Sequence, residues 1–179
     1  WDAIICTSRA VRSVVERQFE LESEYFRRRF GATRVPLPNL PVIPLGIETA
    51  DFAPLPDARD RMRGAHDVPD DGIVVMTMGR LSVVEKANPL PLMIALEHVA
   101  QQTERPIHLW MVGWASRPEE EALHREAATA ICRKVRFRMI DGRHADIRRN
   151  IWAGADIFTL PSDSIQETFG LVPVEAMAA

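Results

Sequence analysis

A strand buried on both faces is predicted by GIVVMTMG, residues 72–79. The run is short, apolar and rich in β-branched residues, with little alternation, which is typical of parallel strands covered by helices on both sides. Four other runs share this character: DAIICTS (2–8), IHLWMVG (107–113), VRFRMI (135–140) and ADIFTLPS (155–162). The chain therefore offers five candidate strands.

Segments with helical spacing alternate with these runs. Ser8 is a candidate N-cap for a helix running toward Arg29, and residues 90–101, 118–131 and 145–152 predict three more helices. Alternating strands and helices favour an α/β fold with a doubly wound parallel sheet. Residues 35–69 hold most of the prolines and have weak periodicity, which indicates a connector.

Composition excludes several classes of protein. The 179 residues are 46% hydrophobic, enough for one domain and a connecting piece, and 22 basic and 25 acidic residues are well mixed. This balance argues against a nucleic-acid binder, and the local patch YFRRRF (25–30) is interpreted as a solvated helix end. No apolar run approaches the ~20 residues that span a bilayer.

The cysteine pattern is sparse. Cys6 and Cys132 lie far apart without a CxxC pair, so we interpret both as buried small apolar residues in a reducing compartment, and expect a cytoplasmic protein. No cluster of residues has metal-ligand spacing, and the sequence therefore predicts no bound metal.

Chemistry is expected where the strands end, because ligands of open parallel sheets bind beyond the carboxyl ends. Arg80 follows the first strand of the doubly wound unit, and Lys86 comes six residues later. Together they could clamp an anion. Taken alone, the pair is equally consistent with two solvated loop cations.

The last stretch, ETFGLVPVEAMAA (167–179), predicts a helix with an anion at its start. The backbone N–H groups of Phe169, Gly170, Leu171 and Val172 would lack partners in its first turn. Glu175 falls on the same helical stripe as apolar residues, and a carboxylate that faces a core is costly unless donors are provided for it. Two vicinal hydroxyls of a ribose could both donate to this carboxylate. Phosphates at the start of the helix and a ribose beside them together indicate a bound nucleotide.

Four segments carry a family resemblance: IPLGIE (43–48), MGRLSVVEK (78–86), ADIFTLPS and ETFGLVPVEAMA. In this order and spacing the chain resembles the carboxy-terminal half of retaining GT-B glycosyltransferases, glycosyltransferase family 4. The last segment is similar to the E-x7-E element of that family, with Glu167 and Glu175 as its acids. The resemblance implies a Rossmann-like, nucleotide-sugar-binding half of a GT-B fold, incomplete at its end.

The resemblance also implies an activity and its residues. A hexosyl group would move from a nucleotide-sugar donor to an acceptor with retention at the anomeric carbon, without a metal or other cofactor. Arg80 and Lys86 would hold the donor diphosphate, Glu175 the ribose hydroxyls, and Glu167 would face the transferred sugar. Further donor contacts would come from the N–H groups of Phe169, Gly170, Leu171 and Val172, and from Met139, Ile140 and Asp141 beside the base.

The resemblance divides the chain into three parts. Residues 1–34 resemble the trailing strand and helix of an amino-terminal domain, residues 35–71 form a Pro-rich connector, and residues 72–179 form the donor domain. The isolated chain is then expected to be inactive. The acceptor, whether saccharide, lipid or another small molecule, is left open, as is peripheral membrane contact through the missing domain.

Two other functions fit the same architecture. One is a GT-B epimerase or phosphorylase, although no motif marks the lysine that a phosphorylase needs for pyridoxal phosphate. The other is a non-enzymatic module that binds a nucleotide sugar.

Overall fold

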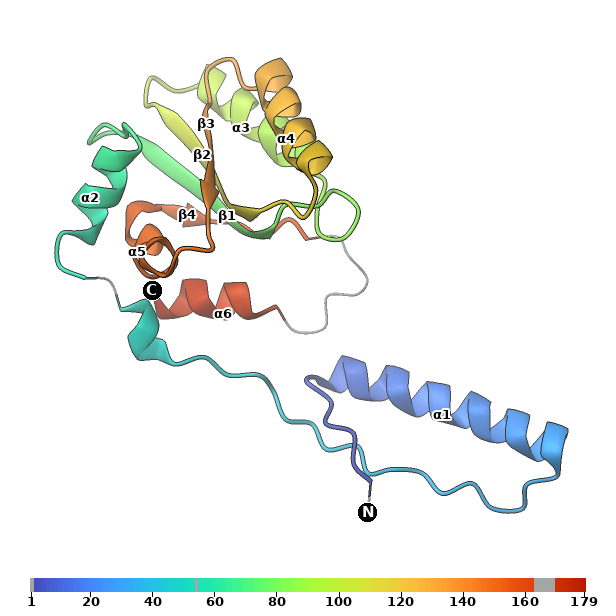
Figure 1. Ribbon diagram of the computed structural model, residues 1–179. Coiled ribbons are helices and arrows are strands. Elements are labelled where there is room, and N and C mark those ends of the chain that lie inside the picture. Colours follow the sequence, from blue (N-terminus) through green and yellow to red (C-terminus); the bar gives the residue numbers. More distant parts are fainter. Residues whose placement is uncertain (1, 54, 163–169) are drawn as a thin grey trace. The chain divides into compact units, whose positions relative to one another are not determined.

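The computed structural model describes residues 2–53, 55–162 and 170–179 (Figure 1). The chain divides into two compact units, one built mainly on Trp1–Ile47 and the other mainly on Glu48–Ile165 with Val172–Ala179. The second unit contains the sheet. None of the helices in the described ranges is long and apolar enough to cross a membrane.

The first unit contains one long helix, α1 (Arg9–Phe30). It begins where the sequence predicts, because the Ser8 hydroxyl accepts a hydrogen bond from the Val11 N–H at 3.1 Å. It ends at Gly31, whose φ of 65° is the left-handed conformation that glycine adopts at little cost. The helix boundaries are therefore set by local capping chemistry.

The strand predicted over residues 2–8 is wrong. This segment forms only isolated parallel bridges, Ala3 with Asn39 and Cys6 with Val42. Its partner segment places Pro41, which has no N–H to donate, between the donors Asn39 and Ile43, so a continuous ladder cannot form between the two.

The second unit is built on a parallel sheet with strand order β3-β2-β1-β4. Its strands are β1 (Ile73–Arg80), β2 (Ile107–Trp114), β3 (Arg136–Asp141) and β4 (Ile157–Phe158). Strands β2 and β3 extend the sheet to one side of β1, and β4 lies on the other side. The winding therefore reverses between β1 and β4, and such a switch point opens a crevice at the carboxyl ends of the strands.

Helices cover both faces of this sheet. Helices α3 (Leu90–Gln101) and α4 (Pro118–Ile131) pack on one face around Leu109 and Met111. On the other face, α5 (Ala145–Gly154) and α6 (Leu171–Ala178) pack around Trp110 and Met76. The prediction of a doubly wound α/β sheet is confirmed (Figure 1).

Two short helices lie in the proline-rich part of the chain, where none was predicted. They are the 3-10 helix η1 (Thr49–Phe52) and α2 (Ala58–Ala65). Of the eight residues of α2, Ala58, Met62 and Arg63 are buried. The helix packs mainly on α5, so tertiary contacts decide its formation.

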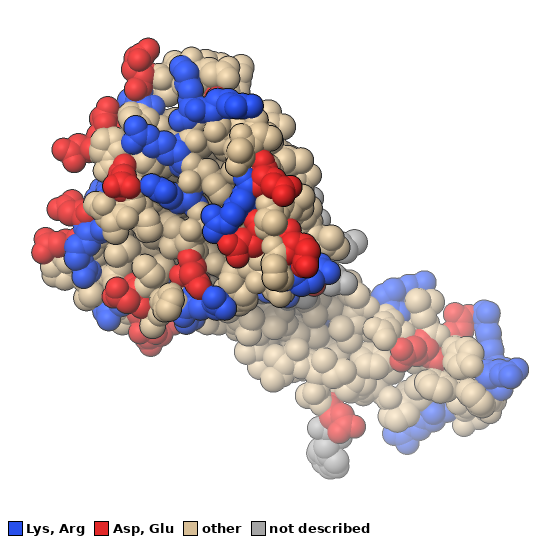
Figure 2. Space-filling model, turned by 45° about the horizontal axis from the view of Figure 1, so that its top comes forward, with Lys and Arg blue, Asp and Glu red and all other residues tan. Residues whose placement is uncertain are grey.

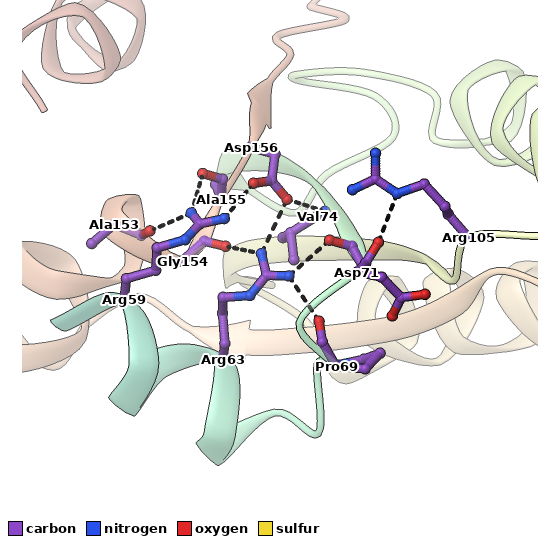
Figure 3. Close-up of polar contacts among 11 residues, drawn as sticks. Arg59, Arg63, Pro69, Asp71, Val74, Arg105, Ala153, Gly154, Ala155 and Asp156 are labelled. Carbon is purple, nitrogen blue, oxygen red and sulfur yellow. Dashed lines mark hydrogen bonds and ion pairs between the residues drawn. The ribbon is translucent and has the colours of Figure 1, made fainter. Parts of the chain in front are cut away.

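An ion-pair network ties α2 to the amino end of the sheet (Figure 3). Asp156 accepts hydrogen bonds from Arg63 Nη1 at 3.1 Å, from Arg59 Nη2 at 2.6 Å and from the Val74 N–H at 2.8 Å. Arg63 also donates to the carbonyl oxygens of Gly72 at 2.7 Å and Pro69 at 2.9 Å. A buried guanidinium with several acceptors and a paired acid can be stable away from water.

The two cysteines differ in burial. Cys6 is fully buried, as expected, whereas Cys132 at the end of α4 is half-buried. Both are free thiols.

Candidate functional site

Glycines form the carboxyl edge of the sheet. Gly79 and Gly113 are paired in the β1–β2 register and have φ values of 155° and 154°, which side chains rarely adopt. A Cβ atom on Gly113 would lie 1.8 Å from the Gly79 carbonyl oxygen, so the two strands approach too closely for any side chain there. Gly142 follows β3 and donates to the Gly113 carbonyl at 3.4 Å. This edge therefore presents bare backbone to whatever lies above it.

A cavity of about 330 Å³ opens over these glycines. A volume of this size is at the lower end for small-molecule sites. The strand ends and the helices α5 and α6 contribute its lining, which consists of Met78, Gly79, Arg80, Gly113, Trp114, Gly142, Arg143, Arg148, Val172 and Glu175. Of the residues predicted from sequence, Arg80, Val172 and Glu175 therefore meet in one cavity.

A second cavity, of about 210 Å³, shares Gly113, Trp114 and Arg143 with the first. Its remaining lining includes the predicted trio of Met139, Ile140 and Asp141, together with Leu81, Ala115, Glu121 and Arg125. The segment expected to border a base thus lies beside the cavity that holds Glu175.

Lys86 lines a smaller cavity, of about 50 Å³, at the switch point between β1 and β4. Arg80 and Ser82 from the end of β1 and Ser162 from the segment after β4 line the same cavity. Arg80 is therefore common to this cavity and the large one.

Two of the arginines are paired with acids on their own loops. Arg80 Nη1 donates to Glu85 Oε2 at 2.7 Å, and both side chains are about half exposed. Arg143 donates to both carboxylate oxygens of Asp141, and the shortest of these contacts joins Nη2 to Oδ2 at 2.6 Å. This fork, with the Arg143 N–H also donating to Asp141, holds the pKa of Asp141 far below its ordinary value. An anionic ligand would have to compete with these acids.

The carboxylate of Glu175 lies in a different environment. Burial raises the pKa of Glu175 above its ordinary value, and the charge of Arg148 opposes this shift only in part. Both residues line the large cavity. On the face seen in Figure 2, basic and acidic side chains are interspersed, which agrees with the balanced charge of the sequence.

The remaining predicted residues lie at the start of α6. Gly170 has a φ of 75° and immediately precedes the helix, and Leu171 is its first residue. Glu167 and Phe169 lie outside the described residues. Within the described ranges, no group of three His, Cys, Asp or Glu residues could hold a metal ion.

Sequence reasoning did not assign seven residues that line the large cavity: Met78, Gly79, Gly113, Trp114, Gly142, Arg143 and Arg148. All of them except Arg148 lie at the end of a predicted strand or within three residues after one, so the rule about strand ends could have identified them. Arg148 lies within α5, where nothing local distinguishes it from the neighbouring Arg149.

The doubly wound sheet, with a cavity beyond the carboxyl ends of its strands, has the fold of GT-B glycosyltransferase structures, and comparison with known proteins gives the family. This chain belongs to the glycosyl transferases group 1 family, whose model matches residues 72–179. No curated protein matches the chain.

Solved structures with the same fold include HepE from Anabaena in complex with UDP and glucose, at 22% identity and a TM-score of 0.63, over 99% of this chain and 42% of that chain. A glycosyltransferase from Rickettsia africae ESF-5 has 18% identity and a TM-score of 0.62, over 99% and 42%. The E. coli trehalose-6-phosphate structure bound with UDP-2-fluoro glucose has 15% identity and a TM-score of 0.64, over 99% and 43%. The chain thus spans less than half the length of each.

Proposed function

We propose that this chain supplies the donor site of a retaining glycosyltransferase, of the family 4 type, which moves a hexosyl group from a nucleoside diphosphate to an acceptor. The observation that carries the proposal is the cavity in which Arg80 and Glu175 meet above the carboxyl edge of the sheet. A guanidinium suits a diphosphate, and a carboxylate suits a vicinal diol. Membership of a glycosyltransferase family supplies the class of reaction.

Glu175 would accept hydrogen bonds from the two ribose hydroxyls. A partly buried carboxylate on the inner side of α6 needs hydrogen-bond donors, and none is found for Glu175 among the described residues. The ribose hydroxyls would supply these donors. The N–H groups of Gly170, Leu171 and Val172, at the start of α6, would donate to phosphate or sugar oxygens. The resemblance assigns Phe169 to the same group of donors and Glu167 to the transferred sugar.

Arg80 and Lys86 would hold the diphosphate and act in catalysis. When the bond between the anomeric carbon and the diphosphate oxygen breaks, negative charge grows on the leaving group, and preorganised cations stabilise it. Arg80 would exchange Glu85 for phosphate oxygens when the donor binds. This arrangement requires no metal ion, and we propose that the enzyme needs none.

The base would occupy the second cavity, beside Met139, Ile140 and Asp141. That cavity adjoins the one that contains Glu175, as the covalent link between ribose and base demands.

A donor screen with the full-length protein tests this function. UDP-glucose comes first, because UDP and glucose are bound in HepE and UDP-2-fluoro glucose in the E. coli structure. Release of nucleoside diphosphate with transfer of the sugar supports the proposal, and NMR of the product tests retention at the anomeric carbon. Binding without turnover would instead indicate a non-enzymatic module, and epimerised donor without transfer would indicate an epimerase.

A further inference from the structure

A buried acid lies outside the proposed donor contacts. Glu120 belongs to the first turn of α4 and is only 9% exposed. Its Oε1 accepts hydrogen bonds from the Ser82 hydroxyl at 2.7 Å and from Arg117 Nη2 at 3.2 Å. The bond from Ser82 is the main reason that the pKa of Glu120 lies below its ordinary value, despite burial. Glu120 is therefore an ionised acceptor held against the loop that follows β1.

Ser82 organises that loop. Its hydroxyl accepts from the Glu85 N–H at 3.2 Å, while its carbonyl accepts from the N–H groups of Lys86 at 3.1 Å and Ala87 at 3.2 Å. Ser82 is itself buried, at 5% exposure. Its position therefore fixes the backbone of the turn that carries Lys86.

The same turn reaches both proposed phosphate-binding cations. Glu85, whose N–H is held by Ser82, pairs with Arg80 through its carboxylate. On the other side of the loop, the Lys86 carbonyl accepts from the Ser162 hydroxyl at 3.3 Å. The loop is thus attached to α4 at one point and to the segment after β4 at another.

We propose that Glu120 is a positioning residue for the diphosphate, acting through Ser82 to hold the Arg80–Lys86 loop in its binding geometry. This inference rests on the proposed function, because it assigns Arg80 and Lys86 to the diphosphate. Glu120 itself contacts no part of the donor in this arrangement. We expect its influence to be strongest at the phosphate end of the site, because Ser82 lines the cavity that contains Lys86, whereas neither Glu120 nor Ser82 lines the cavities of Glu175 and Asp141.

The chain contains a matched control for a role that is only structural. Glu97 on α3 is also a buried acid, at 7% exposure, and it accepts from the N–H groups of Arg133, Lys134 and Val135 at 2.9 to 3.1 Å. These residues precede β3 at the amino end of the sheet, the edge opposite the glycines. Loss of the Glu97 charge should lower stability without moving the loop that follows β1.

The experiment compares Ser82→Ala, Glu120→Ala, Glu120→Gln and Glu97→Gln in the full-length protein. UDP, GDP and ADP are titrated into the wild type by calorimetry to find the diphosphate that binds most tightly. The affinity of each variant for that diphosphate and for its nucleoside is then measured, the nucleoside by NMR. We expect Ser82→Ala and Glu120→Ala to weaken diphosphate binding about threefold to tenfold, the size of one lost hydrogen bond, while nucleoside binding stays unchanged. Glu120→Gln keeps an oxygen that can accept from Ser82, so it should recover most of the affinity. Glu97→Gln should lower the melting temperature with no change for either ligand.

Two results would overturn the inference. Diphosphate affinity that is unchanged in Ser82→Ala and Glu120→Ala, or that falls in parallel with nucleoside affinity, removes the positioning role and leaves the proposed function intact. Failure of the wild type to bind any of the three diphosphates overturns the proposed function and this inference together.

Discussion

Replacing Asp156 by asparagine should destabilise the protein, because it leaves a buried arginine without its acid. In the network shown in Figure 3, Asp156 accepts from Arg59, Arg63 and the Val74 N–H. The side chain of Arg63 is only 8% exposed, whereas that of Arg59 is 48% exposed. The loss therefore falls mainly on the contact between Arg63 and Asp156.

The structure bounds the size of this effect. Breaking a fully buried ion pair by removing one partner costs about 3–5 kcal/mol. Here Asp156 is 28% exposed, Arg63 keeps the carbonyl oxygens of Gly72 and Pro69, and asparagine still offers one acceptor oxygen. We therefore expect a loss of roughly 2–3 kcal/mol in the free energy of unfolding. For a chain of this length, that corresponds to a melting temperature lower by about 4–12 °C.

Urea denaturation and calorimetry of the two proteins measure this difference. Asp67→Asn is the matched control, since Arg138 Nη2 lies 3.1 Å from Asp67 Oδ2 but both side chains are at least half exposed. Such a surface pair contributes about 0–1 kcal/mol. If Asp156→Asn is no more destabilising than Asp67→Asn, the network does not hold α2 on the sheet and the reasoning fails.

Other predictions concern acid, ligand and metal. Burial favours protonation of Asp156, but the hydrogen bonds from Val74, Arg59 and Arg63 outweigh burial and lower its pKa. The contribution of Asp156 to the free energy of unfolding is therefore present above about pH 4 and is lost as the pH falls through the pKa of the folded state. In Asp156→Asn, the free energy of unfolding should depend less steeply on pH in this acidic range. Glu175→Gln should weaken nucleotide binding more than folding; equal losses would contradict a ribose contact. Arg80→Ala and Lys86→Ala should each raise the barrier to turnover by about 2–4 kcal/mol, measured as kcat/KM, and unchanged rates in both would refute the clamp. A chelator should leave turnover of the full-length enzyme intact, and a strict requirement for magnesium or manganese would count against the proposed arrangement.

Local sequence patterns located the four strands of the sheet because each lies in its own apolar run, but only β1 and β2 are buried along most of their length, since β3 alternates in burial and β4 is only Ile157–Phe158. The helices α3 and α4 begin and end at the predicted residues, because local signals such as a proline in the first turn mark their boundaries. Helix α2 was missed because its sequence, ARDRMRGA, has little apolar periodicity. Arg59 and Arg63 of this helix donate to Asp156, which lies more than 90 residues later, and no local pattern predicts such a contact.

Some residues of the candidate site could likewise be predicted from local sequence, and others could not. Arg80, Asp141 and Glu175 could be placed together from sequence because each follows a strand or faces inward on a helix after one. Arg148 and the Ser82–Glu120 contact could not be predicted, since they depend on how helices from distant parts of the chain pack on the sheet. Strand ends thus locate the groups that would touch a donor, whereas the groups that would hold them in place come from packing. Substitutions at Glu120 are for this reason the sharper test of the structure, because the sequence alone gives no ground for expecting an effect on diphosphate binding.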